Sequence, residues 1–155
     1  MVLVQDEAQG RRLAQLGATR IQALGNLKLA AAPLPVDEAA LAALAPRIEG
    51  RDVWLAASTH PGEEAIAASV HRVLAARRPR LLTIIVPRHA ERGRAIAIEL
   101  ASAGFKVARR SAKAAITPQS EIYVADSMGE LGLFYRLAPV ALVAGSYRWQ
   151  GHNPI

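Results

Sequence analysis

The 155-residue sequence contains no cysteine and few aromatic residues. Without cysteine, the chain can form neither a disulfide framework nor a thiolate metal site. Its four histidines are scattered rather than set at metal-ligand spacing, so we predict no bound metal. Aromatic residues make up 5% of the chain, which leaves few surfaces for base stacking and disfavours an RNA-binding module.

The sequence has no long apolar run, and no signal peptide is expected. No run approaches the roughly 20 residues that cross a bilayer, and the chain opens directly with Met1-Val2-Leu3-Val4. These features predict a soluble, cytoplasmic chain. With 52% hydrophobic and 21% charged residues, one globular domain is the default interpretation.

The chain has fewer acidic than basic residues. The net charge is +6 and the sequence pI is about 10.5, with arginine clusters at 77–80 and 109–110. Such a charge suits nucleic acid, anionic lipid or a nucleotide phosphate. An arginine-rich surface of solvated helix ends explains it equally well, so charge alone does not choose a partner.

What the sequence does contain is a repeated arrangement, in which an apolar strand-like run stops in a loop carrying glycine and a charged or imidazole side chain. A helical pattern follows the first three of four runs. In a parallel α/β sheet such loops collect at the carboxyl edge, where helix N-termini present free N–H groups to an anion. We predict a nucleotide site at that edge. The runs cover 53–57, 81–86, 122–125 and 140–144, and the loops cover 58–64, 87–89, 126–130 and 145–154.

The alternation of strands and helices predicts an α/β fold with a Rossmann-like parallel sheet and flanking helices. Strands are expected over 2–5, 20–24, 52–57, 81–86, 106–109, 121–125 and 140–145. Helices are expected over 6–16, 37–48, 61–77, 90–103 and 128–138.

Two of these helices carry apolar stripes that should lie on the sheet. His71 lies off the first stripe, and we predict that it is an ordinary surface histidine. The stripes comprise Ile66, Val70, Val73 and Leu74 in one helix, and Ile96, Leu100 and Ala103 in the next.

The loop after the run at 53–57 has the features of a phosphate cradle. Ser58 and Thr59 offer hydroxyls, and Gly62 lets the backbone approach a ligand without a Cβ in the way. Glu63 and Glu64 lie in the first helical turn, where a carboxylate interacts favourably with the helix dipole. Helix stabilisation is therefore the alternative role for these two glutamates.

Two further loops carry candidate groups. Arg88 and His89 end a strand, and the guanidinium is suited to a two-pronged contact with a phosphate or carboxylate. A solvated arginine near a helix start is the alternative. Ser127 and Glu130 have the Ser-x-x-Glu spacing of a capping box, in which each side chain satisfies a backbone N–H at the helix start.

Five short motifs occur in one order along the chain. Each alone is weak, but five in series are specific. The motifs are Gly-Asn-Leu-Lys at 25–28, Ser-Thr-His-Pro-Gly-Glu-Glu at 58–64, Pro-Arg-His at 87–89, Gly-Glu-Leu-Gly-Leu-Phe-Tyr at 129–135 and Gly-His-Asn-Pro at 151–154. Over nearly its whole length the chain resembles the Kdo transferases, which move 3-deoxy-D-manno-octulosonic acid (Kdo) from CMP-Kdo onto lipid A precursors. Gln150 and Ala144 stand where the family commonly has glycine, so the shape of the last loop is expected to differ.

The resemblance implies an incomplete donor-binding half of a two-domain GT-B-type glycosyltransferase. Residues 1–30 would end the N-terminal acceptor domain, 31–50 would form a linker and a helix, and 51–155 would form part of the C-terminal CMP-sugar-binding domain. The implied partners are CMP-Kdo and, through the other domain, a lipid A precursor. No metal, redox cofactor or nucleic acid is implied. The parent protein would act at the cytoplasmic face of the inner membrane.

The resemblance also implies which residues hold the donor, and it places no catalytic residue here, because the family's general base is a carboxylate of the first domain. For Lys28, an exposed and flexible side chain is the alternative. The donor-binding residues implied are Asn26, Lys28, Ser58, Thr59, His60, Gly62, Glu63, Arg88, His89, Ser127, Gly129, Glu130, Gly145, Ser146, Gly151, His152 and Asn153.

Two other interpretations stay open. One is a non-enzymatic nucleotide- or RNA-binding α/β module that uses its basic surface. The other is a structural fragment without a ligand. In addition, an incomplete sheet would leave an apolar edge strand unpaired, and such an edge is expected to promote self-association.

Overall fold

The computed structural model describes residues 1–25 and 32–145. The chain divides into two compact units, Met1–Pro33 and Leu34–Pro154. The helix expected over 37–48 therefore belongs to the same unit as the sheet that follows it. Within the described ranges no helix is long and apolar enough to cross a membrane.

The N-terminal unit is a small βαβ motif with two parallel strands. Its elements are β1 (Val2–Val4), α1 (Glu7–Gln15) and β2 (Ile21–Ala23). Asp6 caps α1 by accepting a hydrogen bond from the Gln9 main-chain N–H at 2.7 Å. Gly10 lets α1 approach β2 closely, because a Cβ there would lie 3.2 Å from Ile21 Cγ2. The two strands and the helix predicted for this segment are confirmed.

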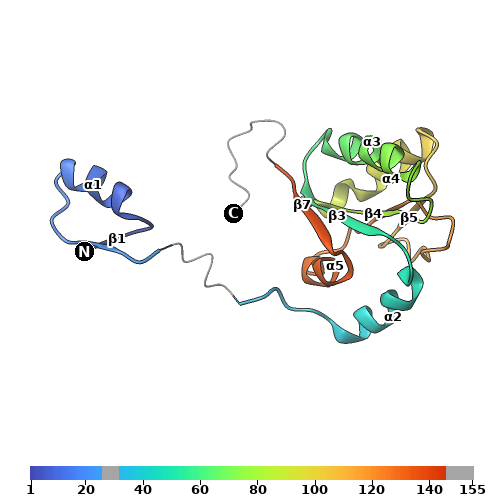
Figure 1. Cartoon of the computed structure of the whole chain (residues 1–155), viewed down its shortest axis with the longest axis horizontal. Coiled ribbons are helices and arrows are strands. Elements are labelled where there is room, and N and C mark those ends of the chain that lie inside the picture. The colour runs from blue at the N-terminus through green and yellow to red at the C-terminus, as the bar shows by residue number, and fades with distance from the viewer. Residues whose placement is uncertain (26–31, 146–155) are drawn as a thin grey trace. The chain divides into compact units, whose positions relative to one another are not determined.

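The second unit is built on a five-stranded parallel sheet, as predicted (Figure 1). Its elements are α2 (Glu38–Ile48), β3 (Val53–Thr59), α3 (Glu63–Ala75), β4 (Leu82–Pro87), the short 3-10 helix η2 (Ala90–Arg92), α4 (Gly93–Ser102), β5 (Val107–Arg109), β6 (Ile122–Val124), α5 (Leu131–Leu137) and β7 (Val140–Val143). The strand order is β5-β6-β4-β3-β7.

This order contains a topological switch point. From β3 the chain first adds β4 on one side, and later returns to place β7 on the other side of β3. Helix α3, which follows β3, and helix α5, which leads into β7, lie on opposite faces of the sheet, and such a switch point opens a crevice at the carboxyl ends of the two strands. In sheets of this type ligands bind in such a crevice, and the corresponding position in this sheet lies beyond the ends of β3 and β7.

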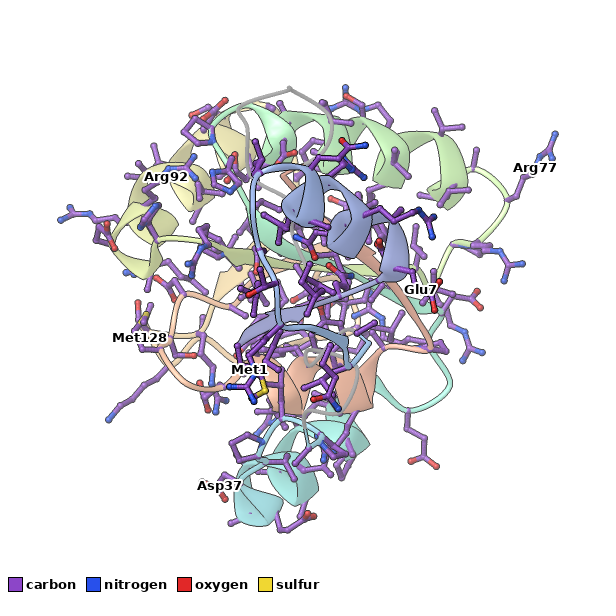
Figure 2. The ribbon with its side chains drawn as sticks, turned by 90° about the vertical axis from the view of Figure 1, so that its left-hand side faces the viewer. Met1, Glu7, Asp37, Arg77, Arg92 and Met128 are labelled. Carbon is purple, nitrogen blue, oxygen red and sulfur yellow. The ribbon has the colours of Figure 1, made fainter. Side chains whose placement is uncertain are left out.

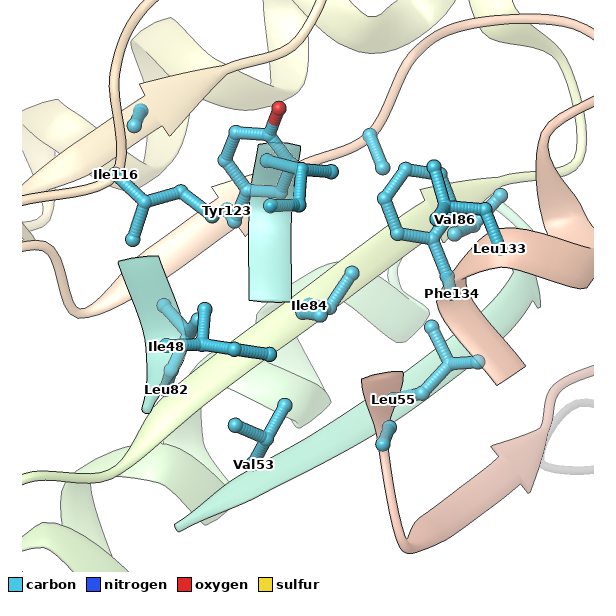
Figure 3. Close-up of a cluster of buried hydrophobic side chains, with 14 of the residues drawn as sticks. Ile48, Val53, Leu55, Leu82, Ile84, Val86, Ile116, Tyr123, Leu133 and Phe134 are labelled. Carbon is cyan, nitrogen blue, oxygen red and sulfur yellow. The ribbon is translucent and has the colours of Figure 1, made fainter. Parts of the chain in front are cut away.

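Two hydrophobic layers hold the helices to the sheet. Helices α2 and α5 cover one face, and α3 and α4 cover the other (Figure 1). In the first layer Phe134 of α5 and Ile48 of α2 meet the strand residues Leu55, Ile84 and Tyr123 (Figure 3). In the second layer the sheet contacts a helix surface rich in alanine.

The segment before α2 is also part of this packing. Gly132 of α5 leaves room for it, because a Cβ there would lie 2.2 Å from the Pro35 carbonyl oxygen. The Leu34 carbonyl oxygen accepts a hydrogen bond from the Arg136 guanidinium at 3.0 Å. Residues 34 and 35 are therefore held against α5 by close packing and by a hydrogen bond.

At the amino edge of the sheet, Arg51 joins the segments that lead into three strands. Its guanidinium donates hydrogen bonds to the main-chain carbonyls of Arg80, Leu81, Thr117 and Ser120. One cation thus satisfies four carbonyl groups that the strand ladders leave unpaired.

The prediction for the apolar stripe of α3 was wrong. Its four residues are 37–73% exposed, whereas Ala67, Ala68 and His71 are buried against the sheet. The small alanine side chains let the helix backbone come close to β3 and β4, and the bulkier face is turned aside. The four residues of that face are Ile66, Val70, Val73 and Leu74.

Part of this bulkier face lines an apolar groove of about 640 Å³ beside β7. Residues of α3 form one wall, and Trp54, Val140 and Leu142 are among the residues of the other. The Trp54 indole N–H is buried without a hydrogen-bond partner among the residues the structure describes. In α4 the expected stripe is confirmed for Ile96 and Leu100 but wrong for the exposed Ala103, which caps the helix end.

The prediction that His71 is a surface residue was also wrong. The imidazole is 2% exposed, and its Nδ1 lies 2.8 Å from Thr83 Oγ1 on β4. Its ring meets Phe105 edge-on at 5.9 Å between centroids. Desolvation by burial lowers the pKa of His71 below its ordinary value of 6.5; Glu121 opposes this shift and Arg51 adds to it.

We predict that His71 makes stability sensitive to mild acid. Because the pKa is lower in the folded chain, the unfolded chain takes up the proton first as the pH falls. The contribution of His71 to the free energy of unfolding should therefore be fully present above pH 6.5. It should decrease as the pH drops below that value and become constant beneath the pKa of the folded chain. Urea unfolding at pH 7.5 and pH 5.5 measures this. His71→Asn should flatten the dependence, whereas substitution of the exposed His89 by Gln should not; an unchanged dependence in His71→Asn would contradict the assignment.

We also predict that the β7 edge promotes self-association. Among the residues that the structure describes, β7 is the outermost strand on one side of the sheet, and its Val140 and Val143 side chains are 63% and 39% exposed. An apolar edge strand is a template for pairing with another chain. Light scattering over a range of concentrations should show association that Val140→Lys reduces. A monomer of constant mass at every concentration would contradict this prediction.

Candidate functional site

The loop after β3 departs from regular strand geometry. The β3–β4 register shifts between Ala57 and Thr59, and Ser58 in between has φ +57, a conformation uncommon for a residue other than glycine. Gly62 follows with φ +93 at the start of α3. Ser58 and His60 are half-buried, so both are partly accessible at the carboxyl end of β3. Such an outlier at a strand end is a recurrent feature of ligand sites.

Glu63 joins the loop after β3 to the end of β7. Its side chain accepts a hydrogen bond from the His60 main-chain N–H at 2.8 Å. The Gly145 main-chain N–H donates to both Glu63 carboxylate oxygens, at 2.8 and 3.1 Å. Glu63 is only 5% exposed. A buried carboxylate therefore bridges the two strands that border the switch point.

Glu64 joins the same loop to the loop after β4. Its Oε1 accepts from the Thr59 hydroxyl at 2.8 Å, and Arg92 contacts both carboxylate oxygens at 2.8 and 3.2 Å. The Glu64 side chain is 7% exposed and that of Arg92 is 25% exposed. Two-pronged contacts between arginine and carboxylate are among the stronger polar interactions. This one holds η2 against the end of β3.

Asp126 holds the loops after β5 and β6 together. Its carboxylate accepts from Arg109 at 2.8 Å, and from the Ser111 N–H and hydroxyl at 2.8 and 2.7 Å. Burial opposes ionisation, but these hydrogen bonds outweigh it and keep the pKa of Asp126 below its ordinary value. Gly93 at the start of α4 lies against the same carboxylate, since a Cβ there would lie 2.1 Å from Asp126 Cβ.

The expected capping box in the loop after β6 is absent. Helix α5 begins at Leu131 instead of 128, and Glu130 flanks it without a side-chain cap. The Ser127 hydroxyl donates to the Glu130 carboxylate, which also accepts from Arg110 Nε at 3.0 Å and from Nη2. The Arg110 hydrogen bond lowers the pKa of Glu130 most, against desolvation. The prediction failed because a cation on the neighbouring loop competes with the helix N–H groups for the carboxylate.

A second cavity, of about 500 Å³, lies beside this pair and is lined in part by Arg47, Lys113 and Tyr123. The Arg110–Glu130 pair forms part of its wall. It therefore opens at the carboxyl ends of β5 and β6, next to the loops described above.

Arg88 differs from the other arginines of this edge. Its main-chain N–H donates to the Thr59 carbonyl at 2.9 Å, which joins the loops after β4 and β3. Its exposed guanidinium has no ion-pair partner within residues 1–25 and 32–145. His89 is exposed too, and its Nδ1 lies 3.8 Å from a carboxylate oxygen of Glu91. Arg88 thus offers a cation to a bound anion.

The carboxyl edge brings most of the predicted site residues together. Figure 2 shows Arg92 and Met128, from the loops after β4 and β6, on one side of this unit and Arg77 on the opposite side. The residues brought to this edge are Ser58, Thr59, His60, Gly62, Glu63, Arg88, His89, Ser127, Gly129, Glu130 and Gly145. The predicted residues Asn26, Lys28, Ser146, Gly151, His152 and Asn153 lie outside the described residues.

Sequence reasoning missed the partners that hold these loops. Arg92 and Ser111 were not considered, and Arg109 was noted only as part of a basic cluster. Adjacent glutamates at a buried helix start require such partners, because unpaired buried carboxylates are costly. That requirement was the available signal, although it does not say which residue answers it. In the ranges that the structure describes, no group of three or more histidine, aspartate or glutamate residues is placed to hold a metal ion.

Comparison with known proteins gives a consistent result, although no family model matches the chain. The 3-deoxy-D-manno-octulosonic acid transferase of Haemophilus influenzae is 35% identical over 162 residues, which cover 100% of this chain and 37% of the relative. The Bordetella pertussis protein of the same name is 36% identical over 159 residues, covering 99% and 37%. A probable mitochondrial transferase of this name from Arabidopsis thaliana is 43% identical over 104 residues, covering 65% and 23%.

A solved structure is similar as well. The crystal structure of the C-terminal CMP-Kdo binding domain of WaaA from Acinetobacter baumannii matches with a TM-score of 0.60 and 34% identity. The match covers 66% of this chain and 54% of that chain. The present chain spans about a third of the length of the curated relatives it matches. Its sequence and its fold agree on one assignment: the chain belongs to the 3-deoxy-D-manno-octulosonic acid transferase family.

Proposed function

We propose that this chain is the CMP-Kdo-binding part of a glycosyltransferase that transfers Kdo to a lipid A precursor. The observation that carries the proposal is the arrangement of the carboxyl edge, where loops from β3, β4, β6 and β7 converge at a topological switch point. The likeness to a CMP-Kdo binding domain supports it. The corresponding sequence motifs supply hydroxyl, guanidinium and main-chain N–H groups at that edge.

The donor would bind over the crevice between the ends of β3 and β7. Its phosphate and its sugar carboxylate are anions, and the start of α3 presents main-chain N–H groups with a favourable helix dipole. Ser58 offers a hydroxyl in the strained turn before that helix. Arg88, whose guanidinium is exposed on the neighbouring loop, would pair with one of the anionic groups.

In the reaction a hydroxyl group of the acceptor would attack the anomeric carbon of Kdo while CMP leaves. The N–H groups of the crevice and Arg88 would stabilise the negative charge that develops on the departing phosphate. The general base and the acceptor site belong, in this proposal, to the acceptor domain of the longer protein. The lipid acceptor would bring that protein to the cytoplasmic face of the inner membrane.

A non-enzymatic nucleotide- or RNA-binding module is the alternative. The net charge of +6 favours it, and the scarcity of aromatic side chains disfavours it. Binding of RNA that weakens steeply with salt and is not displaced by CMP would support the alternative over the donor site.

We predict that CMP binds weakly at the carboxyl edge. Titration followed by NMR should shift amide signals of the loops at 58–63, 87–89 and 127–130. Arg88→Ala should weaken binding by roughly tenfold or more, because a charge-assisted hydrogen bond is lost. Arg77→Ala is the matched control, since Arg77 is exposed on the opposite side of the unit (Figure 2). Shifts confined to the amino edge would contradict this placement.

We further predict that residues 1–155 alone do not transfer Kdo. Without a positioned acceptor, the bound donor lacks the effect of proximity, which is worth about 7–11 kcal/mol of the barrier in good cases. Without a general base, it also lacks help with proton transfer. CMP release from CMP-Kdo in the presence of a lipid A precursor is the measurement. Turnover above the enzyme-free rate would show that the catalytic groups are complete in this chain.

A further inference from the structure

Glu63 occupies an unusual position for a residue of an anion site. Its carboxylate lies at the switch-point crevice, next to the loop that would bind the donor phosphate, yet only 5% of the residue is exposed. Both oxygens are already engaged by main-chain donors, the N–H groups of His60 and Gly145. A carboxylate in this state has little capacity left for a ligand.

The hydrogen bonds of Glu63 continue the pairing of β3 with β7. The last backbone bond between these strands runs from the Ala144 N–H to the Ala57 carbonyl at 2.9 Å. The next N–H, that of Gly145, has Glu63 as its acceptor. Gly145 has φ +98, and a Cβ there would lie 3.6 Å from the His60 ring. The Glu63 side chain therefore sets the direction in which the backbone leaves β7 and its distance from the loop after β3.

Charge also argues against direct contact with the donor. CMP-Kdo carries a phosphate and a sugar carboxylate, and a carboxylate in contact with either would repel it. The N–H groups of His60 and Gly145 offset this repulsion by stabilising the charge of Glu63 inside the protein. An anionic side chain can therefore lie beside an anion site when it stabilises the loops and does not contact the bound anion.

We propose that Glu63 is a positioning residue that fixes the spacing between the two loops bordering the donor crevice and does not itself contact the donor. The proposal rests on the proposed function, since it concerns the same site. Glu64, the next residue, has the matching role on the other side of β3, where it holds the β4 loop through Arg92. Adjacent carboxylates thereby set both borders of the loop after β3.

The geometry explains why a glutamate is needed. Glutamine would offer one oxygen in place of two, and its NH₂ group would face a main-chain N–H. Aspartate is shorter by one methylene group and would not reach His60 and Gly145 together. Neither replacement is expected to restore the bridge, although both keep a polar side chain there.

The test compares Glu63→Gln with the wild-type chain and with Glu99→Gln, an exposed glutamate of α4, as the matched control. In wild type the Gly145 amide signal should lie downfield and exchange slowly with solvent, and it should keep both properties when CMP saturates the chain. In Glu63→Gln the signal should move upfield and exchange at least roughly tenfold faster, as expected when a hydrogen bond to a charged group is lost. Amides of β4 should be unchanged.

Binding of CMP provides the second readout. Glu63→Gln should weaken CMP binding by roughly tenfold, while Glu99→Gln should bind as wild type does. Equal CMP affinity in Glu63→Gln and wild type, or an unchanged Gly145 amide in Glu63→Gln, would overturn the proposal. Loss of the downfield Gly145 signal when CMP binds to wild type would overturn it too, since the donor would then replace Glu63.

The two proposals can fail separately. If wild type does not bind CMP, the proposed function fails, while the Gly145 signal still reports whether Glu63 forms the bridge. If Glu63→Gln does not fold, the Gly145 amide signal of the wild-type chain and its response to CMP test the proposal.

Discussion

Buried carboxylates at the carboxyl edge are the constraint on which the rest of this structure depends. Where parallel strands end, main-chain N–H groups lose their hydrogen-bond partners in the sheet. Each of these N–H groups then needs another acceptor. Glu63, Glu64 and Asp126 supply acceptors and in turn require donors, because a buried charge without a partner is strongly destabilising. Their partners come from neighbouring segments: Gly145 after β7, Arg92 after β4 and Arg109 at the end of β5. Each carboxylate therefore ties two loops together.

At the carboxyl edge, most charged side chains form the structural framework, and a few polar side chains lie outside it. The acidic side chains and most of the arginines satisfy each other, so the framework is close to neutral, and the exposed Arg88 and half-buried Ser58 side chains take no part in these ion pairs. The amino edge is organised in the opposite sense, with Arg51 as the donor and main-chain carbonyls as acceptors. The two edges thus have opposite local chemistry, and the surplus of main-chain donors at the carboxyl edge makes it the side suited to an anion.

Helix α3 shows how packing overrides a simple reading of the sequence. Its larger apolar residues form a regular stripe, and the alanines and His71 form another. The helix turns Ala67 and Ala68 to the sheet because small side chains permit the closer approach, and the imidazole fits where Thr83 gives it a hydrogen bond. Ile66, Val70 and Leu74 of the displaced stripe line the groove beside β7. Periodicity identified a helix and its position along the chain, but two faces of comparable polarity left its rotation undetermined.

The sequence by itself determined the parallel α/β fold, the order of the elements and the edge at which the loops meet. These follow from local apolar runs, from glycines at their ends and from the handedness of crossovers. Only the tertiary structure decided which charged residues are partners. Glu130 has the spacing of a cap, yet it binds Arg110 from the loop after β5, and Glu63 lies beside Gly145 although 82 residues separate them. Such pairs depend on strand order and loop geometry, which bring distant residues within hydrogen-bond reach and which no local pattern encodes.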